Sequence, residues 1–167
     1  MRYEHLRHTI NPVFDERSRV LMLGSFPSPK SREAGFFYGH PQNRMWRVLA
    51  AATGEGAVPQ TVEERAAFLL RNRIAMWDVI ASCSIEGASD ASIRDVVPND
   101  LSSILNAAPI RAVLCTGSKA FQLYRRYQEP VTGVPAQKMP STSAANAAWG
   151  LDRLTEAYSA ALAPLLR

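Results

Sequence analysis

Two segments of this chain gather side chains that can bind or transform a ligand, and the first lies between Gly24 and Trp46. It contains the sequences GSFPS and FFYGHPQNRMW, which bring together prolines, glycines, aromatic rings, a histidine and side-chain amides. Burial in the core explains any single aromatic ring, since such rings are common there. The crowding of rings and amides in one segment instead favours a pocket for a flat molecule.

The second segment is MPSTSAAN, residues 139–146, which precedes the last helical pattern of the chain. Its hydroxyls can cap the amino terminus of that helix, which is a requirement that every helix has. Hydroxyls and free backbone N–H groups at a helix start can equally hold a phosphate group. Both explanations remain open on the residues alone.

Short apolar runs predict the strands that must position these two segments. Residues 19–27, 74–80 and 110–116 are typical of buried parallel strands, and residues 137–140 are a weaker fourth candidate. Helical patterns fill the intervals. Helices are expected over residues 43–53 and 98–105. Three more are expected to begin after Thr61, which forms a capping box with Glu64, after a Ser118 cap, and at about Ala147.

Strands that alternate with helices predict an α/β fold with a parallel sheet covered on both faces, in one domain over residues 1–167. Ligands of such sheets bind beyond the carboxyl ends of the strands. Those ends are expected at residues 24–28, 78–82, 116–118 and 140–143. The site is therefore expected where the two segments meet.

The composition narrows the classes of protein. A chain that is 47% hydrophobic and 20% charged is ordinary for a globular protein, and no apolar run approaches the length of a membrane span. Two cysteines and three histidines without ligand spacing predict no metal and no other cofactor. The net charge of +4 permits a nucleic-acid partner without requiring one. We expect a cytoplasmic protein that is not associated with a membrane.

Taken together, GSFPS, FFYGHPQNRMW and MPSTSAAN resemble the signature motifs of the hypoxanthine-DNA glycosylase branch of the uracil-DNA glycosylase superfamily. The intervening IAMWDVIASCSIEGASDASI is similar to that branch too, and the resemblance runs from about Val13 to the carboxyl terminus. It implies a three-layer α/β/α sandwich with a central parallel four-stranded sheet. It also implies an enzyme that removes deaminated bases, mainly hypoxanthine, from double-stranded DNA. We expect the protein to be a monomer.

The resemblance also assigns roles to residues. Asn43 matches the amide with the main catalytic role in this branch, and Tyr38 matches a ring that stacks on the extruded base. The rest of the base pocket is expected to consist of Gly24, Ser25, Phe26, His40 and Asp78. The residues expected to bind DNA are Pro27, Ser28, Lys30, Ser141, Thr142, Ser143 and Asn146.

Phe26 departs from the wider superfamily, in which uracil- and mismatch-specific members have Asp or Asn at this position to orient water. An apolar ring cannot orient water, so weak or absent activity on uracil is expected. Asn43 can either accept a hydrogen bond from water or donate one to the base.

Other polar residues keep two interpretations each. Asp78 either accepts the N1–H of hypoxanthine or caps a loop, and His40 either polarises a base oxygen or shapes its loop. Lys30, Arg32 and Arg44 either hold phosphates or are solvated. No Schiff-base lysine stands out, which predicts an enzyme that leaves an abasic site.

Two other functions remain open on the sequence. One is a glycosylase of the same superfamily that acts mainly on uracil or xanthine, which Phe26 argues against. The other is a nucleic-acid-binding α/β module without catalysis, which Asn43 and the MPSTSAAN segment argue against.

Overall fold

The computed structural model describes residues 2–167. Its centre is a parallel sheet in the strand order β3-β2-β6-β7, made of β2 (Val20–Gly24), β3 (Ile74–Asp78), β6 (Ala112–Thr116) and β7 (Ala136–Met139). All of β2 is buried, because both faces of this central strand are covered, and its sequence is accordingly apolar without alternation. All four predicted strands are confirmed.

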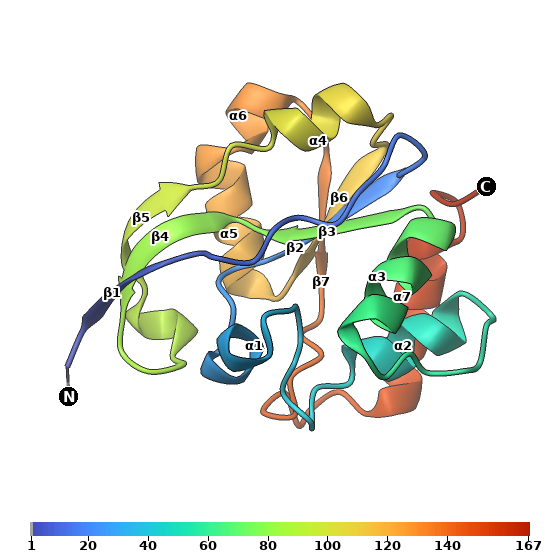
Figure 1. Cartoon of the computed structure of the whole chain (residues 1–167), viewed down its shortest axis with the longest axis horizontal. Coiled ribbons are helices and arrows are strands. Elements are labelled where there is room, and N and C mark those ends of the chain that lie inside the picture. Colours follow the sequence, from blue (N-terminus) through green and yellow to red (C-terminus); the bar gives the residue numbers. More distant parts are fainter. Residues whose placement is uncertain (1) are drawn as a thin grey trace.

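Helices cover both faces of this sheet, as Figure 1 shows. Val20 and Met22 of β2 face a core shared with α2 (Met45–Ala52), α3 (Val62–Arg71) and α7 (Leu151–Leu162). Leu21 and Leu23 face the opposite core, shared with α4 (Ser102–Ala107) and α5 (Ser118–Tyr127). Since successive residues of a strand point to opposite faces, one apolar strand serves two cores. The predicted three-layer α/β/α architecture is confirmed.

Two further helices are short: α1 (Pro29–Ala34) and α6 (Glu129–Thr132).

A small antiparallel sheet beside the main one was not predicted. It has the order β1-β4-β5 and consists of β1 (Glu4–Arg7), β4 (Ile80–Ile85) and β5 (Arg94–Pro98). Only Val79 separates β3 from β4, so one continuous segment serves both sheets. A loop containing the short 3₁₀ helix η1 (Asp90–Ser92) joins β4 to β5. This sheet brings the amino-terminal segment next to the carboxyl end of β3.

Several expected helix boundaries are wrong. Pro98 ends β5, and α4 begins only at Ser102. Ser118 does not cap α5, because the N-cap residue is Gly117 and no side chain caps this helix. The φ of Gly117 is 96°, a conformation that glycine adopts readily. α7 begins at Leu151 and not near Ala147, so residues 140–150 form a loop. The Thr61 cap of α3 is confirmed, since its Oγ1 accepts from the Glu64 N–H at 3.1 Å.

Within residues 2–167, no helix is long and apolar enough to cross a membrane. The same residues contain no cluster of three or more histidine, cysteine, aspartate or glutamate side chains suited to a metal ion. Both cysteines are free and buried, and burial raises the pKa of the Cys115 thiol to about 12. Cys115 is therefore a core thiol and not a nucleophile.

Candidate active site

A pocket of about 290 Å³ opens at the carboxyl ends of β2, β3 and β6. Its volume lies near the lower end of the range for small-ligand pockets, ~300–1,000 Å³, which suits one small flat molecule. The predicted residues that line it are Gly24, Ser25, Phe26, Pro27, Ser28, Tyr38, His40, Asn43, Asp78, Ser141, Thr142 and Ser143. Two others lie elsewhere: Lys30 is exposed on α1, and Asn146 lines an adjoining depression.

Two hydrogen bonds fix the oxygen of the Asn43 side chain. Its Oδ1 accepts from the backbone N–H of Met45 at 2.9 Å and from the Thr142 hydroxyl at 2.8 Å. Because a backbone N–H can only donate, the atom that faces Met45 is the amide oxygen. The Asn43 Nδ2 group has no hydrogen-bond partner among residues 2–167. Its N–H donors are therefore available to a ligand, whereas its oxygen is not available to water.

Tyr38 lines the pocket in an unusual backbone conformation, with a φ of 50°. A left-handed φ at a large side chain costs energy and persists where its surroundings hold it in place. The Tyr38 hydroxyl lies 2.7 Å from Thr116 Oγ1, which in turn donates to the Leu23 carbonyl. Burial and the nearby Asp78 carboxylate raise the pKa of Tyr38 well above its ordinary value, so the phenol is neutral.

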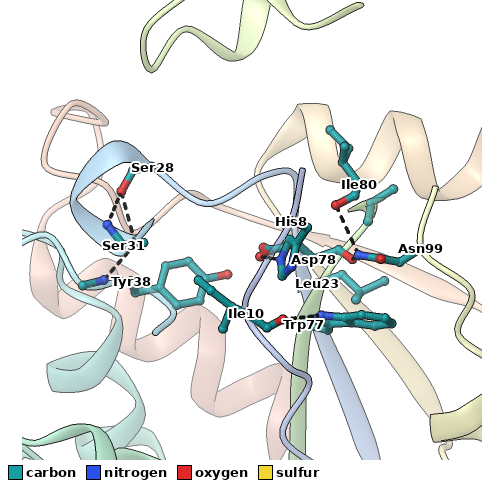
Figure 2. Close-up of polar contacts among 12 residues, drawn as sticks. His8, Ile10, Leu23, Ser28, Ser31, Tyr38, Trp77, Asp78, Ile80 and Asn99 are labelled. Carbon is teal, nitrogen blue, oxygen red and sulfur yellow. Dashed lines mark hydrogen bonds and ion pairs between the residues drawn. The ribbon is translucent and has the colours of Figure 1, made fainter. Parts of the chain in front are cut away.

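The Asp78 carboxylate is buried and lines the pocket from its inner end. It is paired with His8, as Figure 2 shows. His8 Nε2 and Asp78 Oδ2 are 2.7 Å apart, and only 3% and 7% of these two side chains are exposed. His8 follows β1, and its backbone N–H donates to the Ala81 carbonyl at 2.7 Å. His8 therefore holds one carboxylate oxygen and leaves Asp78 Oδ1 for the pocket.

Gly24 provides the space in which these groups converge. A Cβ atom at this position would lie 2.5 Å from Asp78 Oδ1 and 3.2 Å from the Tyr38 hydroxyl oxygen. Contacts of 2.5 Å are too short for non-bonded atoms, so any larger residue would displace the carboxylate. Glycine at the end of β2 thus allows Asp78 and Tyr38 to approach the same point of the pocket.

Phe26 and His40 line the pocket in different ways. The Phe26 ring is buried and packs edge-on against the His8 ring, with 6.1 Å between their centroids. His40 is exposed, and its Nδ1 accepts a hydrogen bond from the Gln42 N–H at 3.1 Å. This bond supports the loop-shaping interpretation of His40. Phe26 presents an apolar wall, as its sequence position suggested.

The loop of residues 140–150 is held from inside the protein. The Arg44 guanidinium donates to the backbone carbonyl oxygens of Thr142, Ser143, Asn146 and Trp149. Arg44 is therefore an internal tie and not a free phosphate ligand. Since α7 begins at Leu151, the hydroxyls of residues 141–143 do not cap it, which removes the capping explanation of this segment. Thr142 is buried, and its hydroxyl positions Asn43.

Replacing Arg44 by alanine is expected to loosen this loop. The variant loses several charge-assisted hydrogen bonds, which should cost about 2–3 kcal/mol of the free energy of unfolding and roughly 5–10 °C in melting temperature. Differential scanning calorimetry measures the stability, and limited proteolysis maps cleavage to residues 141–149. Arg47→Ala, at an exposed position in α2, the helix that Arg44 precedes, is the matched control. An Arg44→Ala protein as stable and protease-resistant as this control would contradict the account.

Two polar residues at the pocket could not be identified from sequence spacing. His8 lies 70 residues from Asp78, and Asp90 lies 65 residues from Ser25, whose hydroxyl donates to Asp90 Oδ1 at 3.0 Å. Asp90 lines the pocket from the loop between β4 and β5. The sequence could have indicated Asp90 as a site residue, because it is an acidic residue in a loop with glycine and serine that follows an apolar run. His8 carried no such signal.

Comparisons with known proteins agree on one family. The sequence model described as the Uracil DNA glycosylase superfamily matches residues 12–165. A protein named Hypoxanthine DNA glycosylase from Methanosarcina acetivorans is 33% identical over 86% of this chain and 90% of its own length. A protein of the same name from Methanosarcina barkeri is 37% identical over 65% of this chain and 70% of its own length. The solution NMR structure of a candidate uracil DNA glycosylase from Methanosarcina acetivorans has a TM-score of 0.81 and 32% identity, and the match covers 96% of this chain and 99% of that one.

Proposed function

The chain belongs to the uracil DNA glycosylase superfamily, and we propose from this premise that it hydrolyses the bond between deoxyribose and hypoxanthine in double-stranded DNA. The proposed product is an abasic site. Relatives named hypoxanthine DNA glycosylases, at 33% and 37% identity, support this substrate. The observation that carries the proposal is the pairing of one donor and one acceptor in a pocket the size of a small ligand.

The donor is the Asn43 Nδ2 group and the acceptor is Asp78 Oδ1. Hypoxanthine presents an N1–H donor beside an O6 acceptor, whereas adenine presents an acceptor and a donor in the reverse order. An ionised carboxylate can only accept and an amide nitrogen can only donate. Hypoxanthine would therefore satisfy both groups, whereas adenine would leave both of them unpaired.

The reaction needs an extruded nucleotide. Flipping costs a few kcal/mol and is cheapest for mispaired or damaged bases, which favours deaminated bases. Stacking of the base on Tyr38 would offset this by about 1–3 kcal/mol. As the glycosidic bond breaks, negative charge develops on the base, and the Asn43 N–H groups stabilise that charge where it forms.

The residues around the pocket also bear on how DNA is held and on the type of reaction. Ser28, Ser141 and Ser143 lie at the pocket and are proposed to contact the DNA backbone. Among residues 2–167, no lysine lines the pocket, which supports a monofunctional enzyme without a Schiff-base step. We also propose that the protein acts as a cytoplasmic monomer, in one domain and without a cofactor.

The test is base release from otherwise identical duplexes that contain a single inosine, xanthine or uracil. Inosine is expected to be cleaved fastest and uracil slowest, since relatives of this chain are named hypoxanthine DNA glycosylases. Strand breaks should appear only after alkali, since a monofunctional enzyme leaves the backbone intact. Faster release of uracil or xanthine would instead indicate a glycosylase of the same superfamily that acts mainly on one of those two bases. DNA binding without release of any base would indicate a binding module.

A further inference from the structure

Hydrolysis of a glycosidic bond requires an acceptor that holds the attacking water. Three candidates in the pocket are unsuited to this task. The Asn43 oxygen already accepts two hydrogen bonds, and Phe26 is apolar. Asp78 lies at the buried floor, where His8 holds one of its oxygens. The water-holding group must therefore come from another part of the pocket wall.

Asp90 is a second carboxylate in the same pocket, at a different depth. It is exposed as a residue, whereas Asp78 is buried, so Asp90 lies at the mouth and Asp78 at the floor. Asp90 also lines the adjoining depression, as do Ser141 and Ser143. The Ser25 hydroxyl donates to Asp90 Oδ1 at 3.0 Å and so orients the carboxylate. Asp90 Oδ2 has no hydrogen-bond partner among residues 2–167.

We propose that Asp90 is the catalytic carboxylate that orients and deprotonates the attacking water, an inference that rests on the proposed glycosylase function. Ser25 immediately precedes Phe26, the residue that cannot orient water, and Ser25, Phe26 and Asp90 line the same pocket. A base enters the pocket ahead of its sugar. The reacting C1′ atom therefore lies towards the mouth, on the side of Asp90, while the base reaches Asp78.

The attacking water supplies both the new bond to the sugar and the protons that move in this step. The C1′–N9 bond breaks and its electron pair leaves with the base, while the water oxygen forms a bond to C1′. One water proton passes to Asp90 and then to solvent, and the hypoxanthine anion takes up a proton. The negative charge of Asp90 also stabilises the positive sugar in the transition state.

The surroundings of Asp90 suit a general base. Although part of the residue is exposed, burial of the carboxyl group raises the pKa of Asp90 above the ordinary value, and the Asp78 charge acts in the same direction. The Ser25 hydroxyl and the Lys119 ammonium group on α5 oppose this rise. A carboxylate with a raised pKa is a better proton acceptor, and a general base works best when its pKa is near the operating pH.

The experiment compares Asp90→Asn with wild type in single-turnover release of hypoxanthine from an inosine duplex between pH 4 and pH 8. The variant is expected to be slower by about 100- to 10,000-fold near neutrality. Wild-type activity should fall as acid protonates Asp90, and this acid limb should vanish in the variant. Binding of the same duplex should change little. Ser25→Ala, which removes only the orienting bond, is expected to be slowed by about tenfold, the equivalent of one ordinary hydrogen bond.

Asp95→Asn serves as the matched control, because Asp95 is an exposed aspartate on the neighbouring strand β5. Its φ of 55° is one that asparagine also tolerates. An Asp90→Asn protein that matches the rate and acid limb of this control would overturn the inference, while the proposed function would stand. A wild-type protein that releases no base would instead remove the proposed function itself, and the inference with it.

Discussion

Replacing Asn43 by alanine is expected to slow the release of hypoxanthine from inosine-containing DNA by about 100- to 1,000-fold, the usual effect of removing one transition-state donor. The physical reason is that the Asn43 Nδ2 group is free to donate, whereas its oxygen is bound by Met45 and Thr142. The loss should appear in the single-turnover rate and much less in DNA binding, because the donor acts on charge that develops during bond cleavage.

The neighbouring amide provides the control for this variant. Gln42 is exposed and does not line the pocket, so Gln42→Ala should release hypoxanthine at the wild-type rate. Thr142→Val adds a finer test, because it removes one of the two hydrogen bonds that fix the Asn43 amide and keeps the amide itself, so its effect should be smaller than that of Asn43→Ala. An Asn43→Ala protein that keeps at least a tenth of wild-type activity would show that another group stabilises the leaving base.

Replacing Asp78 by alanine is expected to reduce hypoxanthine release by about 10- to 100-fold, because the N1–H of the bound base loses its acceptor at a cost of about 1–3 kcal/mol. The selectivity for inosine over adenosine should fall as well, since the carboxylate opposes the N1 acceptor of adenine. Release from inosine and adenosine duplexes, measured in parallel, checks both effects.

His8 offers a second variant that separates stability from recognition in this prediction. Asp78→Ala leaves the buried His8 ring without its partner, so its melting temperature must be measured alongside. His8→Gln can keep a donor near the Nε2 position and should retain most activity, whereas His8→Leu should not. Unchanged selectivity in a folded Asp78→Ala protein would contradict the role of this carboxylate.

Much of the fold follows from the sequence, because buried parallel strands need continuous apolar runs. The runs at residues 19–27, 74–80 and 110–116 are such strands, and their carboxyl ends meet at one edge of the sheet. This rule alone brings Ser25, Asp78 and the loop after β7 to one pocket. The resemblance then added the specific expectations for Asn43 and Tyr38, which line that same pocket.

The parts that could not be predicted depend on contacts between distant segments. β1 and β5 are mostly exposed and lack a strong apolar pattern, so the antiparallel sheet gave little signal. That sheet carries His8 to Asp78. The start of α7 was misplaced because Ala147 and Ala148 are good helix formers, yet residues 142–149 are held as a loop by Arg44. Tertiary hydrogen bonds override local propensity there.

The most direct test of the account is the identification of the released base. Purified protein is incubated with a duplex containing one inosine, and the low-molecular-weight fraction is analysed by liquid chromatography and mass spectrometry. Free hypoxanthine is expected in proportion to alkali-labile abasic sites, and Asn43→Ala should strongly reduce its amount. Intact inosine duplex after prolonged incubation with folded, DNA-bound protein would contradict it.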